Sequence, residues 1–405
     1  MSKKPNWKLH PESAMMRQGY ESDLSEKAVI APIYHSTIYK FNSAKDAEEQ
    51  FKDPSSESSL IYSRLNHPNL RFFEDGLAFW EDAESCAAFS SGMAAIFSIC
   101  FEFLKPGDLI LSSEPLYGGT ASLLNKILPQ KIGIEVIGFN NENFEEKLRY
   151  ITFRLRKSPA MIFIETPANP TIRLVDIGMC RELTNVSKTL LVVDNTLLGP
   201  IYQHPLKHGA DISLYSATKY IGGHSNAVAG ACVGSRQYIE RLKKIRGYLG
   251  NILGPDPSVK MLEGLQTIND RMPKQVNNAC QIAEYLNSHP RIEKVHHLSL
   301  LKEGDPNFAI YKKQCLAPGG LVSLEVRGGK AEAQKFLDSL TVFSRAVSLG
   351  GVESLAQHPY TMTHANVSDK EKKSFGITEN MIRLSIGNEH EEDLIKDLEQ
   401  ALASI

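Results

Sequence analysis

The run Thr189-Leu-Leu-Val-Val-Asp-Asn-Thr196 is a short apolar segment that ends in a carboxylate and two small polar residues. Four other apolar runs, separated by longer amphipathic stretches, occur between about residue 70 and residue 250. They are Asp108–Ser112, Gly133–Ile137, Ala160–Glu165 and Ala210–Ser216. Nearly all-apolar strands that alternate with helices predict an α/β fold with a mostly parallel sheet covered on both faces. In such a sheet, ligands bind at the carboxyl ends of the strands.

The segments on either side of this region predict an arm and a second, smaller unit. The first sixty residues hold few long periodic segments and end in the polar run Lys52–Leu60. After a helical region through residues 261–289, three apolar runs predict strands, and Glu391–Leu402 predicts a closing amphipathic helix. The three runs are Leu321–Val326, Leu340–Phe343 and Met381–Ser385. We expect an N-terminal arm over residues 1–60, a large domain over 61–258 and a smaller α+β domain over 259–405.

The composition excludes several classes of protein. The 405 residues include 45 Lys plus Arg against 47 Asp plus Glu, with a formal net charge of −2, 42% hydrophobic and 23% charged residues. These values are typical of an ordinary globular protein and exclude a disordered or fibrous chain. Because the chain is nearly neutral and has no polybasic run, we expect neither a nucleic acid nor a membrane as its partner.

The N-terminal segment and the cysteines predict a cytoplasmic protein. Residues Met1–Trp7 contain no apolar segment of the kind that a secretory signal needs, and no apolar stretch approaches the roughly 18 residues of a membrane-spanning helix. The six cysteines form no C-x-x-C pair, which predicts reduced and mostly buried thiols. They are Cys86, Cys100, Cys180, Cys232, Cys280 and Cys315.

The segment Ser213–His224 ends a predicted strand with small hydroxyl residues and one lysine, followed by a glycine turn. In a cleft, desolvation and nearby cations would lower the pKa of Lys219 and let its amine attack a carbonyl. Ser216 and Thr218 would offer hydroxyl groups to a phosphate. An isolated motif of this length is more often a surface turn, so the segment is not decisive alone.

Two other predicted strand ends carry side chains that a cofactor would use. Asp194 could serve as a helix cap, or it could keep a pyridinium nitrogen protonated beneath it. Asn169 lies in the segment Glu165-Thr-Pro-Ala-Asn169, where it could donate to a ring phenolate or simply form a turn. Both alternatives stay open on these residues alone.

The segments before these strands offer an anion site and an aromatic residue. In Phe89–Ala95, small residues precede an apolar helix, so the N–H groups of Gly92 and Met93 could hold a phosphate, although an ordinary serine cap explains the same pattern. Tyr117 in Pro115–Gly119 could stack on an aromatic ring and carry a proton. As a lone tyrosine in a turn, it would mean little.

Together these motifs resemble the pyridoxal-phosphate enzymes of cysteine and methionine metabolism, a family that includes cystathionine lyases, cystathionine γ-synthases and methionine γ-lyases. The resemblance extends from about residue 10 to the end of the chain. The matching segments are residues 90–93, 116–119, 165–170, 193–196 and 216–224. The resemblance implies the type I fold of pyridoxal-phosphate-dependent transferases, with pyridoxal 5'-phosphate (PLP) bound by the large domain.

The resemblance also implies a role for individual residues. Lys219 would bind the cofactor covalently, Asp194 would pair with its ring nitrogen and Tyr117 would stack on its face. The remaining cofactor-binding positions are Ser91, Gly92, Met93, Asn169, Thr196, Ser216 and Thr218. Tyr62 and Arg64 match a pair that reaches the phosphate of a neighbouring subunit. The family pattern therefore implies catalytic dimers, usually paired into a homotetramer.

The substrate positions follow from the same resemblance. Arg383 would bind the α-carboxylate of an amino acid, which a planar guanidinium does through two parallel bonds. Ser348 would position Lys219 and the substrate, and Asn169 would also contact the substrate. Lys219 would move the protons in each step, and Tyr117 is a candidate helper at the leaving group. No metal ligand is expected among these residues.

The sequence favours a carbon–sulfur lyase of sulfur amino acids, with cystathionine and methionine as leading substrates. α,β- or α,γ-elimination would give a keto acid, ammonia and a thiol; the alternative is γ-replacement on an O-acylhomoserine. Relatives differ at Val347, Gly119 and Glu263, so these positions do not decide between the reactions. Because Val347 is apolar, it favours a thioether with an uncharged tail, or a pocket of mixed specificity.

A metal-dependent protein is the alternative from another class. His204 and His208 are four residues apart, as are Glu389 and Asp393. Pro205 falls between the two histidines, and no third ligand is evident, so spacing alone gives little support to a metal site. A catalytically inactive relative is also disfavoured, because the lysine, aspartate and arginine of the family pattern are all in place.

Overall fold

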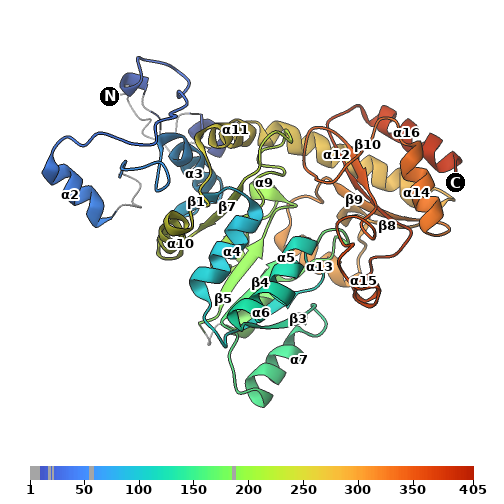
Figure 1. The fold of residues 1–405 in the computed structure, drawn as a ribbon. Coiled ribbons are helices and arrows are strands. Elements are labelled where there is room, and N and C mark those ends of the chain that lie inside the picture. The colour runs from blue at the N-terminus through green and yellow to red at the C-terminus, as the bar shows by residue number, and fades with distance from the viewer. Residues whose placement is uncertain (1–9, 17–19, 21, 54–58, 185–187) are drawn as a thin grey trace.

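The computed structural model describes the chain except residues 1–9, 17–19, 21, 54–58 and 185–187, which are grey in Figure 1. The interpretation of Met1–Trp7 and the middle of the polar run Lys52–Leu60 therefore lie outside the described residues. The helices are α1 Pro11–Ala14, α2 Ala44–Lys52, α3 Pro68–Trp80, α4 Gly92–Phe103, α5 Gly118–Ser122, α6 Leu128–Ile132, α7 Phe144–Arg149, α8 Ile177–Thr184, α9 Gly199–Tyr202, α10 Arg236–Leu249, α11 Pro255–Gln266, α12 Ile268–Asn287, α13 Pro306–Gln314, α14 Lys330–Ser339, α15 Asp369–Phe375 and α16 Glu391–Ala403. Short 3₁₀ or π turns are η1 Ser22–Leu24, η2 Leu123–Ile127, η3 Tyr150–Arg154, η4 Pro205–His208 and η5 Leu298–Leu300.

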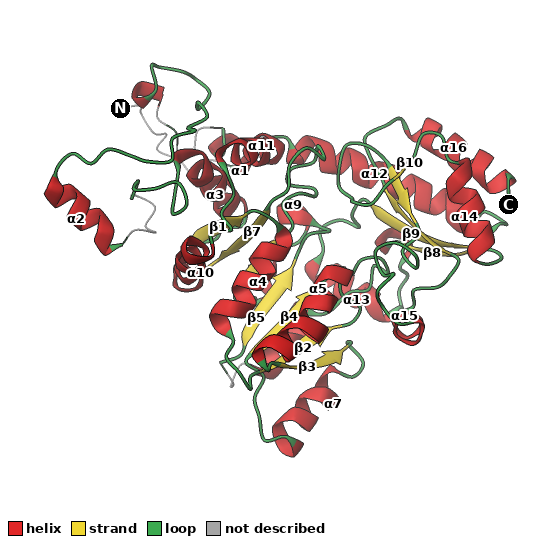
Figure 2. Cartoon of the chain, viewed as in Figure 1, coloured by secondary structure: helices red, strands yellow, loops and turns green. Residues whose placement is uncertain are grey.

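A seven-stranded sheet forms the centre of the large domain within the described residues, in the order β1-β7-β6-β5-β4-β2-β3 (Figure 2). Its strands are β1 Ser85–Phe89, β2 Leu109–Ser113, β3 Glu135–Phe139, β4 Met161–Glu165, β5 Leu190–Asp194, β6 Ile212–Tyr215 and β7 Gly230–Gly234. Strands β2 to β6 run parallel, and β7 is antiparallel to both of its neighbours. The mostly parallel α/β sheet is thus confirmed. The five predicted runs match β2 to β6 within two residues at each end, whereas β1 and β7 were not predicted.

Both faces of this sheet are buried, which explains why its strands are continuously apolar. Along β4, Met161 and Phe163 pack into one core with α4 and α10, and Ile162 and Ile164 pack into another with α7 and α8. Successive side chains of a strand point to opposite faces, so a strand covered on both sides needs an apolar residue at every position.

A five-stranded sheet in the order β10-β11-β12-β9-β8 forms the smaller domain within the described part of the chain. Its strands are β8 Ile292–His296, β9 Leu321–Val326, β10 Ser344–Arg345, β11 Leu355–Gln357 and β12 Met381–Ser385. Its core packs against α12, α14 and α16. Helix α12 contributes Met272 to a core of the large domain and Ile282 to that of the smaller one. The boundary expected after residue 258 stays a prediction.

One strand of the smaller domain was predicted in the wrong place. Residues Leu340–Phe343 form a bend between α14 and β10. The buried carboxylate of Asp397 accepts the backbone N–H groups of Thr341, Val342 and Phe343 at 2.8, 2.9 and 3.0 Å. Because a side chain from α16 satisfies these donors, the segment needs no neighbouring strand, and Leu340 and Phe343 are buried without a ladder, whereas Val342 is exposed.

The N-terminal segment contains more structure than the expected arm. Helix α2 projects away from the large domain at the blue end of Figure 1, and none of its residues is buried. The cysteines agree with their prediction: all six are free thiols, and all but Cys280 are buried. No helix in the described ranges is both long and apolar enough to span a bilayer.

Candidate active site

A cavity of about 320 Å³ lies at the carboxyl ends of β4, β5 and β6, where residues of the smaller domain also reach it. Four segments that follow strands of the parallel sheet meet there with the start of α4 and with β12. The predicted residues that line it are Ser91, Gly92, Met93, Tyr117, Asn169, Asp194, Thr196, Ser216, Thr218, Lys219, Ser348 and Arg383. The fold thus brings together residues that are up to almost three hundred positions apart in the sequence.

The start of α4 offers free donors at one end of this cavity. Ser91 caps the helix and accepts the N–H of Ala94 at 3.0 Å, whereas the N–H groups of Gly92 and Met93 have no acceptor among the described residues. A Cβ on Gly92 would lie 3.0 Å from Ser216 Cβ, so glycine permits the close approach of these two segments. The hydroxyl of Ser216 likewise has no partner in the described part of the chain. Such donors fit a phosphate group.

Two threonines of the predicted set use their hydroxyl groups within the protein. Thr218 Oγ1 donates to the carbonyl of Ala229 at 3.1 Å and accepts its N–H at 2.9 Å. Thr196 Oγ1 donates to Asp194 Oδ1 at 2.6 Å and accepts the N–H of Ser216 at 2.9 Å. Thr196 therefore orients the aspartate and joins it to the turn that carries Ser216.

Lys219 lies in the turn after β6, and no carboxylate lies within ion-pair distance among the described residues. Its Nζ donates to Ser348 Oγ at 2.8 Å. Burial, with a smaller contribution from the charge of Arg383, lowers the pKa of Lys219 to about 8. Because its neutral form is accessible near pH 8, the amine can act as a nucleophile and as a base.

Two carboxylates end neighbouring strands at the floor of the cavity. Glu165 on β4 and Asp194 on β5 lie directly opposite each other. Burial raises the pKa of both groups, and for Glu165 the charge of Asp194 acts in the same direction. Asp194 accepts two bonds from Thr196 through Oδ1, while Oδ2 has no partner in the described residues. This oxygen is available to a cationic group of a ligand.

Arg383 extends from β12 into the same cavity without a carboxylate partner among the described residues. Its Nη1 donates to Asn169 Oδ1 at 3.2 Å, and its Nη2 donates to the carbonyl of Ser348. Gln357, opposite it on β11, can accept from Nη1 and Nε at 3.0 and 3.2 Å through its amide oxygen. Burial lowers the pKa of Arg383 to about 10. A buried, oriented guanidinium without a counter-charge fits an incoming carboxylate.

The ring of Tyr117 covers Gly119, and the structure provides a physical reason for the small residue there. A Cβ at Gly119 would lie 2.6 Å from the Tyr117 ring and 3.1 Å from Met93 Sδ, so a larger side chain would displace the tyrosine. Val347 lies at the rim of the cavity and is 61% exposed. Glu263 is exposed on α11 and does not line the cavity.

Tyr62 and Arg64 do not line the cavity of their own chain. The guanidinium of Arg64 lies 5.8 Å from the centre of the Tyr62 ring and donates to the carbonyl of Gly247. Their contact with a neighbouring subunit stays a prediction. As for the metal alternative, no group of three or more His, Cys, Asp or Glu side chains in the described ranges is arranged to hold an ion.

Two residues of the cavity region were given no role by the sequence. Glu165 follows the same pattern as Asp194, a carboxylate at the end of an apolar strand, so that signal could have singled it out. Gln357 carries no comparable signal, because only the pairing of β11 with β12 brings it to Arg383.

Comparison with known proteins places this arrangement in context. The family model of the Cys/Met metabolism PLP-dependent enzymes matches residues 12–403. The chain is 37% identical to an L-methionine gamma-lyase of Fusobacterium nucleatum over 92% of its length and 93% of that protein. It is 36% identical to a cystathionine beta-lyase of Coxiella burnetii over 99% and 100% of the two chains. The structure of a cystathionine gamma synthase from Xanthomonas oryzae, in complex with cystathionine, superposes with a TM-score of 0.90 at 33% identity, over 98% and 99% of the two chains.

Proposed function

The chain belongs to the Cys/Met metabolism PLP-dependent enzymes, and from this premise we propose that it is a carbon–sulfur lyase that acts on sulfur amino acids. The reaction is α,β- or α,γ-elimination, which releases a keto acid, ammonia and a thiol. The observation that carries the proposal is a partly buried lysine with a lowered pKa in one cavity with two further groups. Among the described residues, these are a carboxylate with one oxygen that has no partner and an arginine without a counter-charge.

The residues of the cavity fit PLP. The free N–H groups at the start of α4 and the Ser216 hydroxyl suit its phosphate, Asp194 suits its ring nitrogen and Lys219 suits its carbonyl carbon. Asn169 is close to these groups as a candidate donor to the ring oxygen. When bound, PLP supplies a conjugated ring that stores the negative charge left on the substrate α-carbon.

The protein groups then orient the substrate and move its protons. Arg383 binds the α-carboxylate and so directs the α-hydrogen and the side chain of the substrate. The amine of Lys219 takes the α-proton. For γ-elimination, the same amine removes a second proton from Cβ after it has given up the first. The hydroxyl of Tyr117, which has no partner in the described residues, donates a proton to the leaving sulfur.

The rim of the cavity supports a substrate with an uncharged tail. Val347, Leu349 and Val228 line the cavity. Val347 offers no charge to an ammonium group at the far end of a substrate. This surface favours methionine or a pocket of mixed specificity that also takes cystathionine. The alternative function is γ-replacement on an O-acylhomoserine, which the likeness to a cystathionine gamma synthase structure keeps as the second candidate.

We further propose a cytoplasmic homotetramer built from catalytic dimers, with a small-molecule substrate. The six free thiols are typical of a reducing compartment. The position of Tyr62 and Arg64 outside their own cavity supports a role for them in a neighbouring subunit, as the family pattern implies. The molecular mass in solution, with and without the Arg64→Ala substitution, tests the assembly.

The reaction is tested by incubating the protein with PLP and cystathionine, without any added thiol, and identifying the keto acid. Pyruvate indicates β-elimination, and 2-oxobutanoate indicates γ-elimination, after which methionine is the next substrate. If neither acid forms but the bound cofactor still absorbs visible light, the O-acylhomoserine transferase is favoured, and an added thiol will be incorporated into product. A colourless protein that does not bind PLP would contradict the proposal.

A further inference from the structure

Glu165 joins two turns that lie on different segments of the cavity wall. Its Oε2 accepts the backbone N–H of Tyr117 at 2.6 Å, and its Oε1 accepts the backbone N–H of Asn169 at 2.8 Å. The residue is 5% exposed, and its backbone N–H is itself bonded to Ser113 Oγ at 3.0 Å. One buried carboxylate therefore determines how far apart the two turns lie.

These bonds continue into the rest of the site. Asn169 Oδ1 accepts from Arg383 Nη1 at 3.2 Å, and Arg383 Nη2 donates to the carbonyl of Ser348. The hydroxyl of Ser348 accepts from Lys219 Nζ at 2.8 Å. A continuous series of hydrogen bonds thus runs from the Tyr117 turn to the lysine. Every other side chain in it has a proposed role toward cofactor or substrate.

Glu165 and Asp194 are neighbours that bond to different partners. They lie opposite each other on β4 and β5. Asp194 leaves Oδ2 without a partner in the described residues, whereas both oxygens of Glu165 are occupied by backbone N–H groups. Asp194 can therefore bond to a ligand directly, and Glu165 can act only through the groups that it holds.

We propose that Glu165 is a positioning residue, which sets the place of Tyr117 and Asn169, and through Asn169 that of Arg383, relative to the cofactor ring. The inference rests on the proposed function, because it requires PLP in this cavity. It gives Glu165 a role that neither the strand-end pattern nor the proposed chemistry includes. Burial and the charge of Asp194 raise the pKa of Glu165, and the two bonds from backbone N–H groups act against them.

The test is Glu165→Gln, which keeps the size of the side chain. A glutamine oxygen can accept one of the two N–H groups, but its NH₂ then faces the other donor, so one turn is released. We expect the visible circular dichroism of bound PLP to change, because this signal reports the orientation of the cofactor ring. We also expect kcat to fall about 10²-fold, as small displacements of reacting groups can cause. The affinity for PLP should change far less, since Lys219 and the phosphate donors are intact.

The matched control is Asp397→Asn in the smaller domain. Asp397 is also a buried carboxylate that accepts several backbone N–H groups, but it does not line the cavity. It should alter the melting temperature while leaving the circular dichroism of PLP as in the wild type. If Asp397→Asn changes this signal as Glu165→Gln does, the effect reflects general loss of stability, and the inference is overturned.

The remaining outcomes separate this inference from the proposed function. A Glu165→Gln protein with wild-type circular dichroism, kcat and KM overturns the positioning role and leaves the lyase proposal intact. A wild-type protein that does not bind PLP overturns both. If Glu165→Gln does not fold, Glu165→Asp replaces it: this side chain keeps the charge but is one methylene too short to reach both donors. The same spectral change is then expected, and its absence overturns the inference.

Discussion

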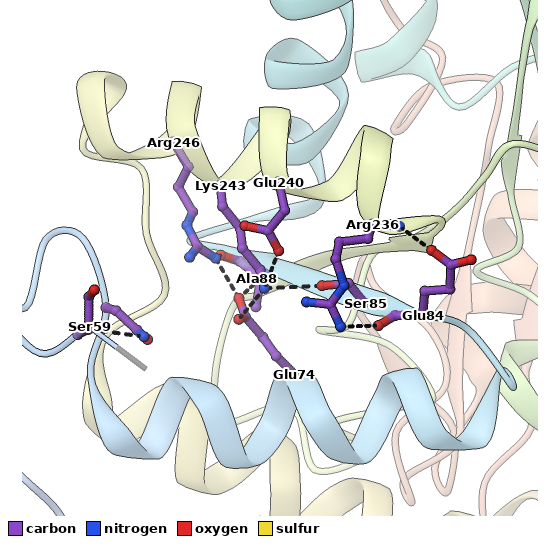
Figure 3. Close-up of polar contacts among 10 residues, drawn as sticks. Ser59, Glu74, Glu84, Ser85, Ala88, Arg236, Glu240, Lys243 and Arg246 are labelled. Atoms are coloured by element: carbon purple, nitrogen blue, oxygen red, sulfur yellow. Dashed lines mark hydrogen bonds and ion pairs between the residues drawn. The ribbon is translucent and has the colours of Figure 1, made fainter. Parts of the chain in front are cut away.

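Two lysines of the large domain, the buried Lys243 and the partly buried Lys219, have opposite surroundings. Lys243 on α10 is 2% exposed and lies 3.3 Å from Glu240 and 4.0 Å from Glu74, and it donates to Ser85 Oγ at 3.1 Å (Figure 3). Glu74 also binds Arg246 Nη1 at 2.5 Å and accepts the N–H of Ala88. Lys219 has a hydroxyl group as its hydrogen-bond partner and, among the described residues, no carboxylate within ion-pair distance.

The comparison separates the effect of burial on a lysine from the effect of an oppositely charged neighbour. In the cluster of Glu74, Lys243 and Arg246, both buried cations lie within ion-pair distance of the Glu74 carboxylate, and these contacts contribute to structure. In the cavity, burial and, to a smaller extent, the like charge on Arg383 lower the pKa of Lys219 to about 8. Lys219 is thus reactive because, among the described residues, the fold places no carboxylate beside it. The predictions below are ordered from the largest expected effect to the smallest.

Lys219→Ala should abolish the visible absorption of bound PLP and reduce turnover by about 10⁴-fold or more, since it removes both the covalent attachment and the base. Absorption spectra and a keto-acid assay measure the two effects. Lys243→Met is the matched variant, and it should keep the absorption of the cofactor. If Lys219→Ala retains wild-type turnover, or if Lys243→Met loses the cofactor in the folded state, the contrast between the two lysines is wrong.

Glu74→Leu should lower the free energy of unfolding by about 3–5 kcal/mol, because it leaves the buried Arg246 without its carboxylate and removes one of the two carboxylates beside Lys243. Denaturant unfolding of the protein measures this loss. The double variant Glu74→Leu with Arg246→Met should recover part of it, since apolar groups can replace a buried ion pair at little cost. An unchanged midpoint for Glu74→Leu would contradict a structural role for the cluster.

The rate at which the cofactor-free protein binds PLP should rise with pH, with a midpoint near 8, because only the neutral amine of Lys219 attacks a carbonyl. Burial and the charge of Arg383 both favour the neutral amine, so removing that charge raises the pKa. Arg383→Gln should therefore move the midpoint upward, toward the ordinary value of 10.5. Stopped-flow absorption measures the rate. A midpoint that stays in place in Arg383→Gln would show that burial alone lowers the pKa.

Ser348→Ala should slow turnover only about fivefold, the equivalent of one hydrogen bond worth about 1 kcal/mol. The variant removes the hydroxyl that accepts from Lys219 Nζ but keeps the backbone carbonyl that binds Arg383. Steady-state kinetics should thus show a lower kcat with a nearly unchanged KM. A large increase in KM instead would indicate that the hydroxyl holds the substrate.

Much of the fold could be predicted, because β2 to β6 are local apolar patterns that a sheet buried on both faces requires. Strand β7 was not predicted, because it does not resemble the apolar parallel strands of the sheet: three residues of Gly230–Gly234 are Gly or Ala. A Cβ at Gly230 would lie 2.2 Å from the carbonyl oxygen of Ser91, so this strand needs small residues for close packing against α4. The segment Leu340–Phe343 has the apolar pattern of a strand. The N–H groups of its last three residues, however, donate to the carboxylate of Asp397 and not to a neighbouring strand.

The sequence by itself determined which polar residues follow each strand and in what order they occur along the chain. Strand periodicity and family motifs are properties of short segments, so they can be read without the tertiary structure. Only the tertiary structure decided which of these groups have partners. Within the described ranges, Asp194 keeps an oxygen without a partner while Glu165 does not, and Lys219 lacks the carboxylate that Lys243 has. The physical reason is that hydrogen bonds and charge compensation depend on distances of a few ångströms between residues that are far apart in the chain. Those distances exist only after β4, β5, β6 and β12 have come together around the cavity.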